Sequence, residues 1–257
     1  MLTEAKVWGA IPEGFRKVTA GRGIRLVVRE DRANEIDPSI CREANGSPRP
    51  SRHHGRGPLR ALRMSDGETA LIRGYRHGGL LRALTRAWFA SWPPRPFREL
   101  AITEELRRRG LRTVEVYAAA VERVYGPLYR GCLVTRELSG AKDLWAALQD
   151  PSTDAERLGA VLKASAETIR AMHREGVYHA DLNLKNILVR FHAGRAESYI
   201  IDFDRARLFL GNLPVPLRRK NLERLRRSAR KLDPQRRYLS VGAWNQFLDF
   251  YYGADDA

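Results

Sequence analysis

The segment VYHADLNLKNILV, residues 177–189, constrains the fold of this chain more than any other part of its sequence. It is a polar loop that leads directly into apolar residues, and two strand-like runs, NILVRF and SYIIDF, are joined around Gly194. Short apolar runs joined by a glycine turn are typical of paired strands. The sequence therefore predicts a polar loop followed by a pair of short strands.

A long helix is predicted before this loop. Apolar residues between Leu158 and Met172 keep to one narrow face, which is the pattern of a helix packed against a core. Thr153 and Glu156 have the spacing of a capping box at its start, and Gly176 is placed to end it. The order helix, polar loop, strand pair and acidic strand end is more informative than any one of these elements alone.

Four polar residues of this region form a chemical pattern. His179, Asp181 and Asn186 occur as H-x-D-x-x-x-x-N, and Asp202 follows at the end of the second strand, in YIIDFD. Phosphate transfer from ATP needs a carboxylate near the acceptor hydroxyl and oxygen ligands for Mg²⁺ beside the phosphates. The pattern matches the catalytic loop and the metal-binding motif of protein-kinase-like phosphotransferases.

Each of these residues has an expected role. Asp181 is the candidate base that takes or orients the proton of the acceptor hydroxyl, and Asn186 and Asp202 are the candidate ligands of Mg²⁺. His179 and Lys185 complete the predicted catalytic group, with His179 expected to hold the loop in place more than to carry a proton.

The N-terminal half is predicted to contain strands and one long loop. The first thirty residues alternate enough for one or two strands, and residues 31–54 are expected to be irregular, because Pro, Ser, Asn and basic residues occur there without apolar periodicity. The Asp66-Gly67 turn between PLRALRM and ETALIRGY predicts a β-hairpin.

A glycine-rich turn lies directly before this hairpin. Gly55 and Gly57 flank Arg56, and a glycine turn between strands lets backbone N–H groups approach a phosphate closely. Gly55 and Gly57 are therefore candidates for nucleotide binding. Gly21-Arg22-Gly23 is an alternative, although it is far from the following paired strand.

A helix and two further strands are predicted after the hairpin. FRELAITEELRRR, residues 97–109, has mixed helical spacing, and strands are expected around Val114 to Val121 and from Gly131 to Leu138. The second of these strands breaks at Ser139-Gly140, which is a plausible hinge between two lobes. Residues 1–138 are thus predicted to form an N-lobe and residues 139–257 a C-lobe.

An arginine must replace the lysine that usually holds the ATP phosphates on the third strand of a kinase. No lysine occurs between Lys17 and Lys142, and Arg73, in the sequence ALIR, occupies the place of the usual lysine. Two alternatives remain open at this point: Arg76 takes this role, or Arg73 is an exposed strand arginine.

Acidic residues are expected to complete the nucleotide site. The partner of Arg73 is predicted on the next helix, where Glu99 fits best and Glu104 is second. Glu137, at the end of the strand before the hinge, is also assigned to cofactor binding.

Composition limits the partners and the compartment. The formal net charge of +16 favours polyanionic partners such as a lipid surface bearing phosphate, a phosphorylated sugar or nucleic acid. Cys41 and Cys132 have no metal-ligand spacing and are predicted to be free thiols of a reducing compartment. The N-terminus lacks a signal pattern, and no apolar run is long enough to span a membrane, so a cytoplasmic location is expected.

Over most of residues 55–232 the sequence resembles the lipopolysaccharide core kinases that phosphorylate 3-deoxy-D-manno-octulosonic acid (Kdo) or heptose. The matching pieces are GRG at 55–57, RGYRHGGLLRAL at 73–84, FREL at 97–100, GVYHADLNLKNIL at 176–188, IDFDRARL at 201–208 and NLERLRRSARKL at 221–232. YHADLN together with IDFDRAR is specific, and it is more similar to the Kdo kinases than to general protein kinases.

This resemblance implies an α+β, protein-kinase-like bilobal fold with a small β-rich N-lobe and a mainly helical C-lobe. It implies ATP and Mg²⁺ as cofactors and a sugar hydroxyl of the lipopolysaccharide inner core, Kdo or heptose, as the acceptor. An arginine at position 73 agrees with it. Asp204, in the place of the glycine of D-F-G, either assists Asp202 at the metal or caps the next turn.

The resemblance also implies an anionic, lipid-linked substrate at the cytoplasmic face of the inner membrane. Residues 75–92, YRHGGLLRALTRAWFASW, either lie against the membrane surface or pack their apolar side chains inside. The basic stretch at 218–232 is open to the same two readings, anionic lipid binding or a solvated helical face.

Three other functions compete with this one. A small atypical protein kinase is disfavoured because no A-P-E motif and no long activation segment follow Asp202. An aminoglycoside-type phosphotransferase is disfavoured because a basic chain does not suit a cationic acceptor. A non-enzymatic role, as a degenerate kinase that binds lipopolysaccharide or as a nucleic-acid-binding protein, is disfavoured because the catalytic carboxylates are present and no nucleic-acid reading motif accompanies the charge.

Overall fold

The structure is a computed structural model that describes residues 8–21, 23–44, 59–75 and 88–253. The chain divides into two compact units, the first made of residues 1–105 and 115–137 and the second of residues 106–114 and 138–257. The sequence places a boundary after residue 138, and the contacts of residues 106–114 group this short segment with the second unit although it precedes that boundary.

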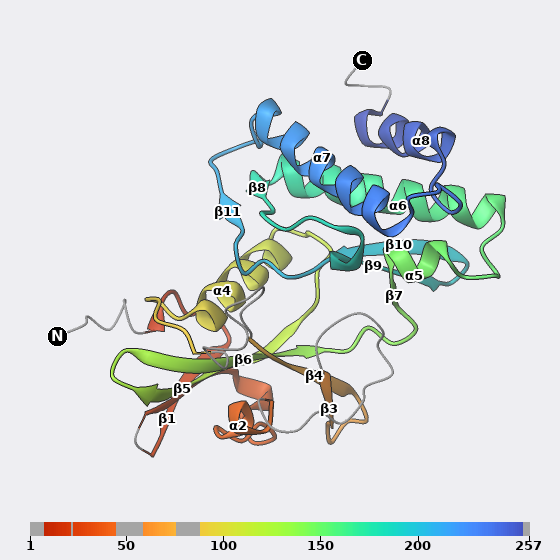
Figure 1. Cartoon of the computed structure of the whole chain (residues 1–257). Helices are drawn as coiled ribbons and strands as arrows, with labels where there is room; N and C mark the ends of the chain where they lie inside the picture. Colours follow the sequence, from red (N-terminus) through yellow and green to blue (C-terminus); the bar gives the residue numbers. More distant parts are fainter. Residues whose placement is uncertain (1–7, 22, 45–58, 76–87, 254–257) are drawn as a thin grey trace. The chain divides into compact units, whose positions relative to one another are not determined.

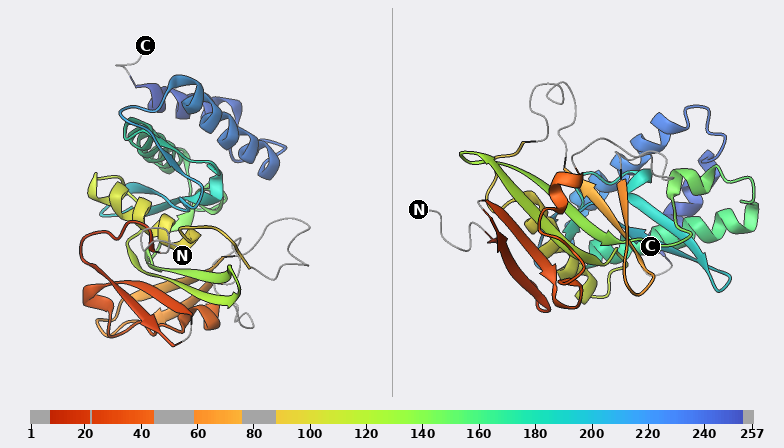
Figure 2. Two further views of the ribbon diagram at one scale, coloured as in Figure 1. Left: turned by 90° about the vertical axis from the view of Figure 1, so that its left-hand side faces the viewer. Right: turned by 90° about the horizontal axis from the view of Figure 1, so that it is seen from below.

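The first unit is built on a six-stranded antiparallel sheet with the strand order β1-β2-β5-β6-β4-β3. The strands lie side by side in both views of Figure 2. Their bounds are Phe15–Ala20 (β1), Ile24–Arg29 (β2), Leu59–Arg63 (β3), Thr69–Gly74 (β4), Val116–Tyr125 (β5) and Leu128–Arg136 (β6). The predicted hairpin at residues 58–74 is confirmed, because β3 and β4 pair with each other across the Asp66-Gly67 turn.

Apolar side chains cover both faces of this sheet. β5 is buried over its first seven residues because alternate side chains enter two different clusters. One cluster includes Ile40 from the short helix α2 (Ile40–Ala44), and the other includes Phe97 and Leu100 from α4 (Arg95–Arg108). A few apolar side chains of α2 and α4 thus pack these helices against the sheet.

Residues 31–54 were expected to be irregular, and this expectation is wrong for part of the segment. A 3-10 helix, η1, spans Glu30–Arg32, and α2 follows before residues 45–54, which lie outside the described part of the chain. α2 is too short to show a helical period in the sequence. Burial of Ile40 and Cys41 against the sheet stabilises it instead.

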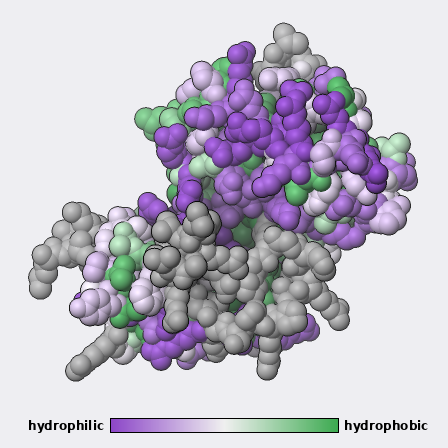
Figure 3. Space-filling model, in the orientation of Figure 1, coloured by the Kyte–Doolittle hydropathy of each residue, from purple (hydrophilic) through white to green (hydrophobic). Residues whose placement is uncertain are grey.

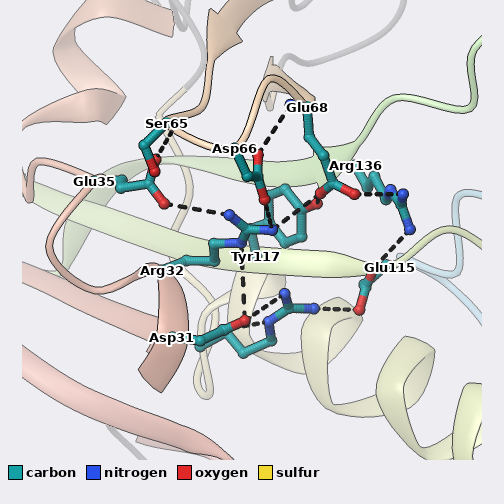
Figure 4. A network of polar contacts seen from close by, with 10 residues as sticks. Asp31, Arg32, Glu35, Ser65, Asp66, Glu68, Glu115, Tyr117 and Arg136 are labelled. Carbon is teal, nitrogen blue, oxygen red and sulfur yellow. Dashed lines mark hydrogen bonds and ion pairs between the residues drawn. The ribbon is translucent and has the colours of Figure 1, made fainter.

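Charged side chains connect η1 to the β3–β4 turn in the first unit (Figure 4). Arg32 lies 2.5 Å from the carboxylate of Asp66, 3.0 Å from that of Glu68 and 3.2 Å from that of Glu35. The hydroxyl of Tyr117 also donates to Glu68. The turn and the segment after β2 are therefore joined through one guanidinium group.

The second unit contains most of the helices. They are α5 (Leu144–Leu148), α6 (Ala155–Arg174), η2 (Leu184–Asn186), α7 (Val215–Leu232) and α8 (Val241–Tyr252). Its strands are β7 (Lys142–Asp143), β8 (Val177–Tyr178), β9 (Ile187–His192), β10 (Arg195–Ile200) and β11 (Arg207–Leu208). β9 pairs with β10 and with β7, and β8 pairs with β11, all antiparallel (Figure 1). The predicted helix, loop and strand pair are confirmed in this order.

The start of α6 differs by one residue from the prediction. Asp154, not Thr153, is the N-cap, and its carboxylate accepts a hydrogen bond of 2.9 Å from the backbone N–H of Arg157. The hydroxyl of Thr153 instead donates to the carbonyl of Ala147, at 2.9 Å. Both threonine and aspartate can cap a helix. Thr153 does not cap α6 because its hydroxyl already donates to Ala147.

Gly176 ends α6 as predicted, and two observations require a glycine at this position. Its φ is +70°, and a Cβ atom would lie 2.3 Å from the carbonyl oxygen of Gly211 and 2.4 Å from that of Phe209. The backbone N–H of Phe209 donates to the carbonyl of Gly176 at 2.9 Å. This close approach brings the chain after β11 against the start of β8, directly before the polar loop.

Cys41 and Cys132 are free thiols, as predicted, and both are buried in the sheet cluster that contains α2. Their sulfur atoms lie 2.8 Å apart, and burial raises the pKa of the Cys41 thiol well above its usual value. Protonated, buried thiols are poor nucleophiles. In the described part of the chain, no helix combines the length and the apolar character needed to cross a bilayer.

Candidate active site

The polar loop after β8 is fixed by the imidazole of His179, which is 1% exposed. Its Nδ1 accepts a hydrogen bond of 3.2 Å from the backbone N–H of Asp181, so the proton of a neutral ring is on Nε2. Nε2 then donates to the carbonyl of Ile201 at 3.1 Å. Burial lowers the pKa of His179 and keeps it neutral, so this residue holds the loop to the end of the strand pair.

The backbone of Asp181 is held from the other side by two amides. Its carbonyl oxygen accepts hydrogen bonds from Nδ2 of Asn183 at 2.9 Å and from Nδ2 of Asn186 at 2.8 Å. The Asp181 side chain is exposed, and no described residue donates a hydrogen bond to its carboxylate. A fixed backbone with an available carboxylate suits a group that must accept a proton from a substrate hydroxyl.

Asn186 and Asp202 are brought next to each other by the backbone. The N–H of Ile201 donates to the carbonyl of Asn186 at 3.0 Å, so Asp202 follows directly after a residue paired with Asn186. Asn186 is 7% exposed and uses its amide nitrogen within the loop. Its amide oxygen has no donor among the described residues and is the atom that Mg²⁺ prefers.

Asp202 has a strained backbone. Its φ is +72°, which is rare for an aspartate and costs on the order of 1–3 kcal/mol. The structure holds this conformation because Phe203, the next residue, is fully buried and packs on His179 with ring centroids 5.3 Å apart. Strain of this kind is concentrated at functional sites, where it fixes the direction of one side chain.

These contacts are compatible with Mg²⁺. The residues present offer one carboxylate and one amide oxygen, and Mg²⁺ commonly takes only one or two ligands from protein. No cluster of three or more His, Cys, Asp or Glu side chains that could form a closed metal cage occurs among the described residues. Asp204 is half-buried after Phe203, and Lys185 is half-buried in η2, so both predicted residues belong to the same region of the second unit.

A buried chain of hydrogen bonds extends from the loop into the helices, and the sequence did not reveal it. Asn221 on α7 donates from Nδ2 to the carbonyl of His179 at 2.7 Å and accepts from its N–H at 3.2 Å. Oδ1 of Asn221 also lies 3.1 Å from Nε2 of His173 on α6, and Nδ1 of His173 lies 2.7 Å from the hydroxyl of Tyr251 on α8. Three helices thus contribute to holding one loop.

The first unit contains the predicted ion pair between Arg73 and Glu99. Nη2 of Arg73 on β4 lies 2.5 Å from Oε1 of Glu99 on α4. Glu99 is 2% exposed, and the hydroxyl of Tyr75 donates to its second oxygen. The alternative partner, Glu104, accepts a hydrogen bond of 2.9 Å from the backbone N–H of Val116.

A small residue allows α4 to lie close enough for this pair. A Cβ atom on Gly131 of β6 would lie 2.5 Å from Cγ of Pro96, in the first turn of α4. The glycine therefore sets the distance between the helix and the sheet in the first unit, and Glu99 lies in the next part of that helix.

Of the other predicted residues, one is described and three are not. Glu137 follows β6, and its backbone N–H donates to the carbonyl of Thr69 at 2.8 Å. Gly55, Gly57 and Arg76 lie outside the described residues.

The segment 75–92 is described only in part. Phe89 is buried and packs on Tyr129, whereas Trp88 is 38% exposed. The reading in which Leu80, Leu81, Leu84 and Trp88 pack inside is not supported at Trp88, and the three leucines lie outside the described residues. The structure makes no statement about residues 76–87.

The sequence profile of the "Lipopolysaccharide kinase (Kdo/WaaP) family" matches residues 51–251, which include both the Arg73–Glu99 pair and the Asp181 loop. This chain belongs to that family. The resemblance predicted from YHADLN and IDFDRAR is thereby confirmed, and the predicted class of ATP-dependent kinase acting on a sugar hydroxyl agrees with the names of its relatives.

Several curated relatives in the Kdo/WaaP family are named 3-deoxy-D-manno-octulosonic acid kinase. The protein of Vibrio vulnificus (strain YJ016) is 36% identical over 166 residues, which is 63% of this chain and 66% of that protein. The protein of Xylella fastidiosa (strain 9a5c) is 35% identical over 190 residues, 71% of this chain and 70% of that protein. The match with the Vibrio vulnificus kinase thus spans just under two thirds of its length.

The fold also has a solved relative. WaaP, in a structure described as "WaaP in complex with acyl carrier protein", superposes with a TM-score of 0.56 at 25% identity, covering 89% of this chain and 88% of WaaP. Together with the six-stranded antiparallel sheet and the helical second unit, this confirms the predicted α+β, protein-kinase-like fold class.

Proposed function

We propose that this Kdo/WaaP family chain transfers the γ-phosphate of ATP to a hydroxyl of a sugar in the lipopolysaccharide inner core. Kdo is the first acceptor to test, because the curated relatives are named Kdo kinases, and a heptose is the second. The observation that carries the proposal is the exposed carboxylate of Asp181 on a loop whose backbone is fixed by three side chains, those of His179, Asn183 and Asn186.

In this proposal Asp181 accepts or orients the proton of the acceptor hydroxyl. Asn186 and Asp202 hold Mg²⁺ through one amide and one carboxylate oxygen, with Asp204 beside them. The magnesium ion, when bound, neutralises charge on the phosphates. The positive φ of Asp202 supports its role as a ligand of Mg²⁺, because a fixed backbone at this residue fixes the direction of its carboxylate before the ion binds.

Arg73 is proposed to bind the phosphates of ATP, with Glu99 and Tyr75 fixing the direction of its guanidinium group. An arginine offers two parallel N–H donors to phosphate oxygens and stays charged at any relevant pH. Lys185 and Glu137 are proposed to contact the substrates from the catalytic loop and from the end of β6. Gly55 and Gly57 are proposed to approach the phosphates through their backbone N–H groups.

The lipid-linked acceptor leads us to propose peripheral contact with the cytoplasmic face of the inner membrane. The net charge of +16 supports attraction to anionic lipid. So does the hydrophilic face that Figure 3 shows over α7, where the exposed basic side chains are Arg219, Lys220, Arg226, Arg227, Arg230 and Lys231. Such attraction weakens as salt rises.

The test is mass spectrometry of Kdo-bearing lipid A after incubation with the purified chain, ATP and Mg²⁺. We expect the gain of one phosphate, and we expect Asp181→Asn to reduce the rate by about 10²-fold or more, because general acid–base catalysis contributes that much. Asp249→Asn is the matched control, since Asp249 is an exposed aspartate of α8 in the same unit.

Full activity of a folded Asp181→Asn protein would remove the centre of the proposal. No phosphate gain on Kdo, with a gain on heptose-extended core, would keep the reaction and change the acceptor. No gain on either sugar, in a protein that hydrolyses ATP, would shift the acceptor to another class.

A further inference from the structure

The second unit contains a pocket that the proposed phosphate transfer does not use. It has a volume of about 260 Å³, and the residues that line it come from the C-terminal ends of α6 and α8 and from the start of α7. Four arginines line it: Arg170 and Arg174 from α6, and Arg218 and Arg219 from α7. The other lining residues are neutral or apolar at pH 7, and they include His173.

The positive charge of this pocket is not balanced within the described chain. No acidic side chain lines the pocket, and no described carboxylate forms an ion pair with any of the four arginines. The one protein contact among their guanidinium groups is from Nε of Arg218 to the carbonyl of Leu213, at 2.6 Å. Four guanidinium groups around one hollow repel one another unless an anion lies between them.

The start of α7 adds to this positive potential. The helix is 18 residues long, its N-cap is Pro214 without a side-chain cap, and its first turn contains no acidic residue. The N-terminus of a helix carries a partial positive charge, so acidic residues are usually favoured there. α7 contributes this charge and not a row of N–H donors, because Pro216 has no N–H and the N–H groups of Leu217 and Arg218 donate to the carbonyl of Pro214. Arg218 and Arg219 near this end place positive charge where negative charge is usually preferred. These two arginines are therefore unfavourable in the free protein and are better explained by a bound anion.

We propose that this pocket binds a phosphate-bearing anion. The shared chemistry is a tetrahedral phosphate group, from a free phosphate or diphosphate or from the headgroup of a lipid, held by paired guanidinium donors. The inference does not rest on the proposed kinase activity, because none of the four arginines has a role in the transfer.

The exposure of the four arginines indicates which of them to change. Arg170 and Arg218 are half-buried, whereas Arg174 and Arg219 are exposed and form no hydrogen bond with described residues. The double variant Arg174→Gln/Arg219→Gln therefore removes two charges from the pocket without disturbing packing. Lys163→Gln/Arg195→Gln is its matched control, because both residues are exposed in the second unit and line no part of this pocket.

The experiment is isothermal titration of the full-length chain with inorganic pyrophosphate, without Mg²⁺ and with saturating ADP to occupy the nucleotide site. We expect the Arg174→Gln/Arg219→Gln variant to bind at least about tenfold more weakly than the wild type, because each removes a charge-assisted contact. The control variant should bind as the wild type does. Equal binding by all three proteins, or no binding by the wild type, overturns the proposal.

A second assay distinguishes the source of the phosphate. If it is a lipid headgroup, the pocket variant loses more binding to phosphatidylglycerol-containing vesicles than the control variant does, and pyrophosphate competes with the vesicles. If it is a free phosphate, pyrophosphate does not compete with the vesicles, while pyrophosphate binding still falls in the pocket variant. Both results support the pocket, and thermal unfolding of each variant without anion verifies that it is folded.

Discussion

Two polar networks in this molecule stabilise a turn or a loop, one in each unit, and they are built from different groups. In the first unit, charged and partly exposed side chains around Arg32 connect η1 to the β3–β4 turn (Figure 4). In the second unit, buried groups at Asn221, His173 and Tyr251 hold the Asp181 loop, and the two ring nitrogens of His173 both have partners.

The difference follows from burial. Ionised groups lose much of their hydration energy when they are fully buried, whereas neutral groups can be buried if each donor finds an acceptor. Asn221 is 0% exposed and His173 is 1% exposed, so the second network is made of groups that carry no charge at pH 7. The two networks should therefore respond to different perturbations.

The largest effect is expected from Asn221→Leu. This change leaves the buried N–H and carbonyl of His179 without their partner on α7, which costs about 3 kcal/mol of unfolding free energy. We also expect kcat of the proposed transfer to fall at least about tenfold with little change in KM for ATP, because the loop and not the nucleotide contacts is disturbed.

Chemical denaturation and steady-state kinetics measure the two effects of Asn221→Leu separately. Asn221→Asp is the informative companion, since it retains the acceptor for the His179 N–H and loses the donor, and an intermediate kcat is expected. Unchanged kcat in a folded Asn221→Leu protein would show that the loop does not depend on α7.

A comparable loss of unfolding free energy is expected when the pH is lowered. Burial, with Arg218 nearby, lowers the pKa of His173 from 6.5 to about 4. The unfolded state then binds more protons than the folded state between these two values, so the stability from this group is present above pH 6.5 and is lost as the pH falls towards 4. The loss is roughly 3 kcal/mol when the whole range is crossed.

Urea unfolding at a series of pH values between 4 and 7 measures this loss. His173→Gln should show a clearly smaller slope, with part of the slope remaining because burial also lowers the pKa of His179. If the wild type and His173→Gln have the same slope, folding does not lower the pKa of His173, and the network takes up a proton below pH 6.5.

The smallest effect is expected in the charged network of the first unit. Arg32→Gln should destabilise the chain by about 1 kcal/mol at low salt, because its ion pairs are only partly buried, and the difference should shrink in 1 M salt. Thermal unfolding at two salt concentrations checks this, with Arg63→Gln, an exposed arginine of β3, as the control. A salt-independent difference would mean that packing of Arg32 on Tyr117, and not its charge, is what matters.

The arrangement of the Asp181 loop could be predicted from the sequence because its residues are close together in the chain. His179, Asp181 and Asn186 lie within one loop, and Asp202 follows at the end of an adjacent strand, so spacing alone defines the pattern. The same holds for the β3–β4 hairpin, whose Asp66-Gly67 turn is a local signal. The ion pair between Arg73 and Glu99 could be predicted because a strand cation and a glutamate on the next helix form an ion pair in protein kinases.

The supporting contacts could not be predicted, because they join residues far apart in the chain. Asn221 lies at a buried position of a basic helix, and a lone polar residue on an otherwise apolar face was its only signal. α2 was missed because five residues cannot show a helical period. The arginine pocket was not visible either, because Arg170 and Arg218 come together only through the packing of α6 and α7.

The link from Tyr251 through His173 and Asn221 to His179 also orders events during synthesis of the chain. The ribosome adds residues from the N-terminus, so the loop with Asp181 emerges before α7 and before α8. Until α7 has docked, the backbone N–H and carbonyl of His179 lack their partner, Asn221, and until α8 has docked, His173 lacks the hydroxyl of Tyr251. A nascent chain would therefore complete this buried link to the Asp181 loop only after the last described helix has been added.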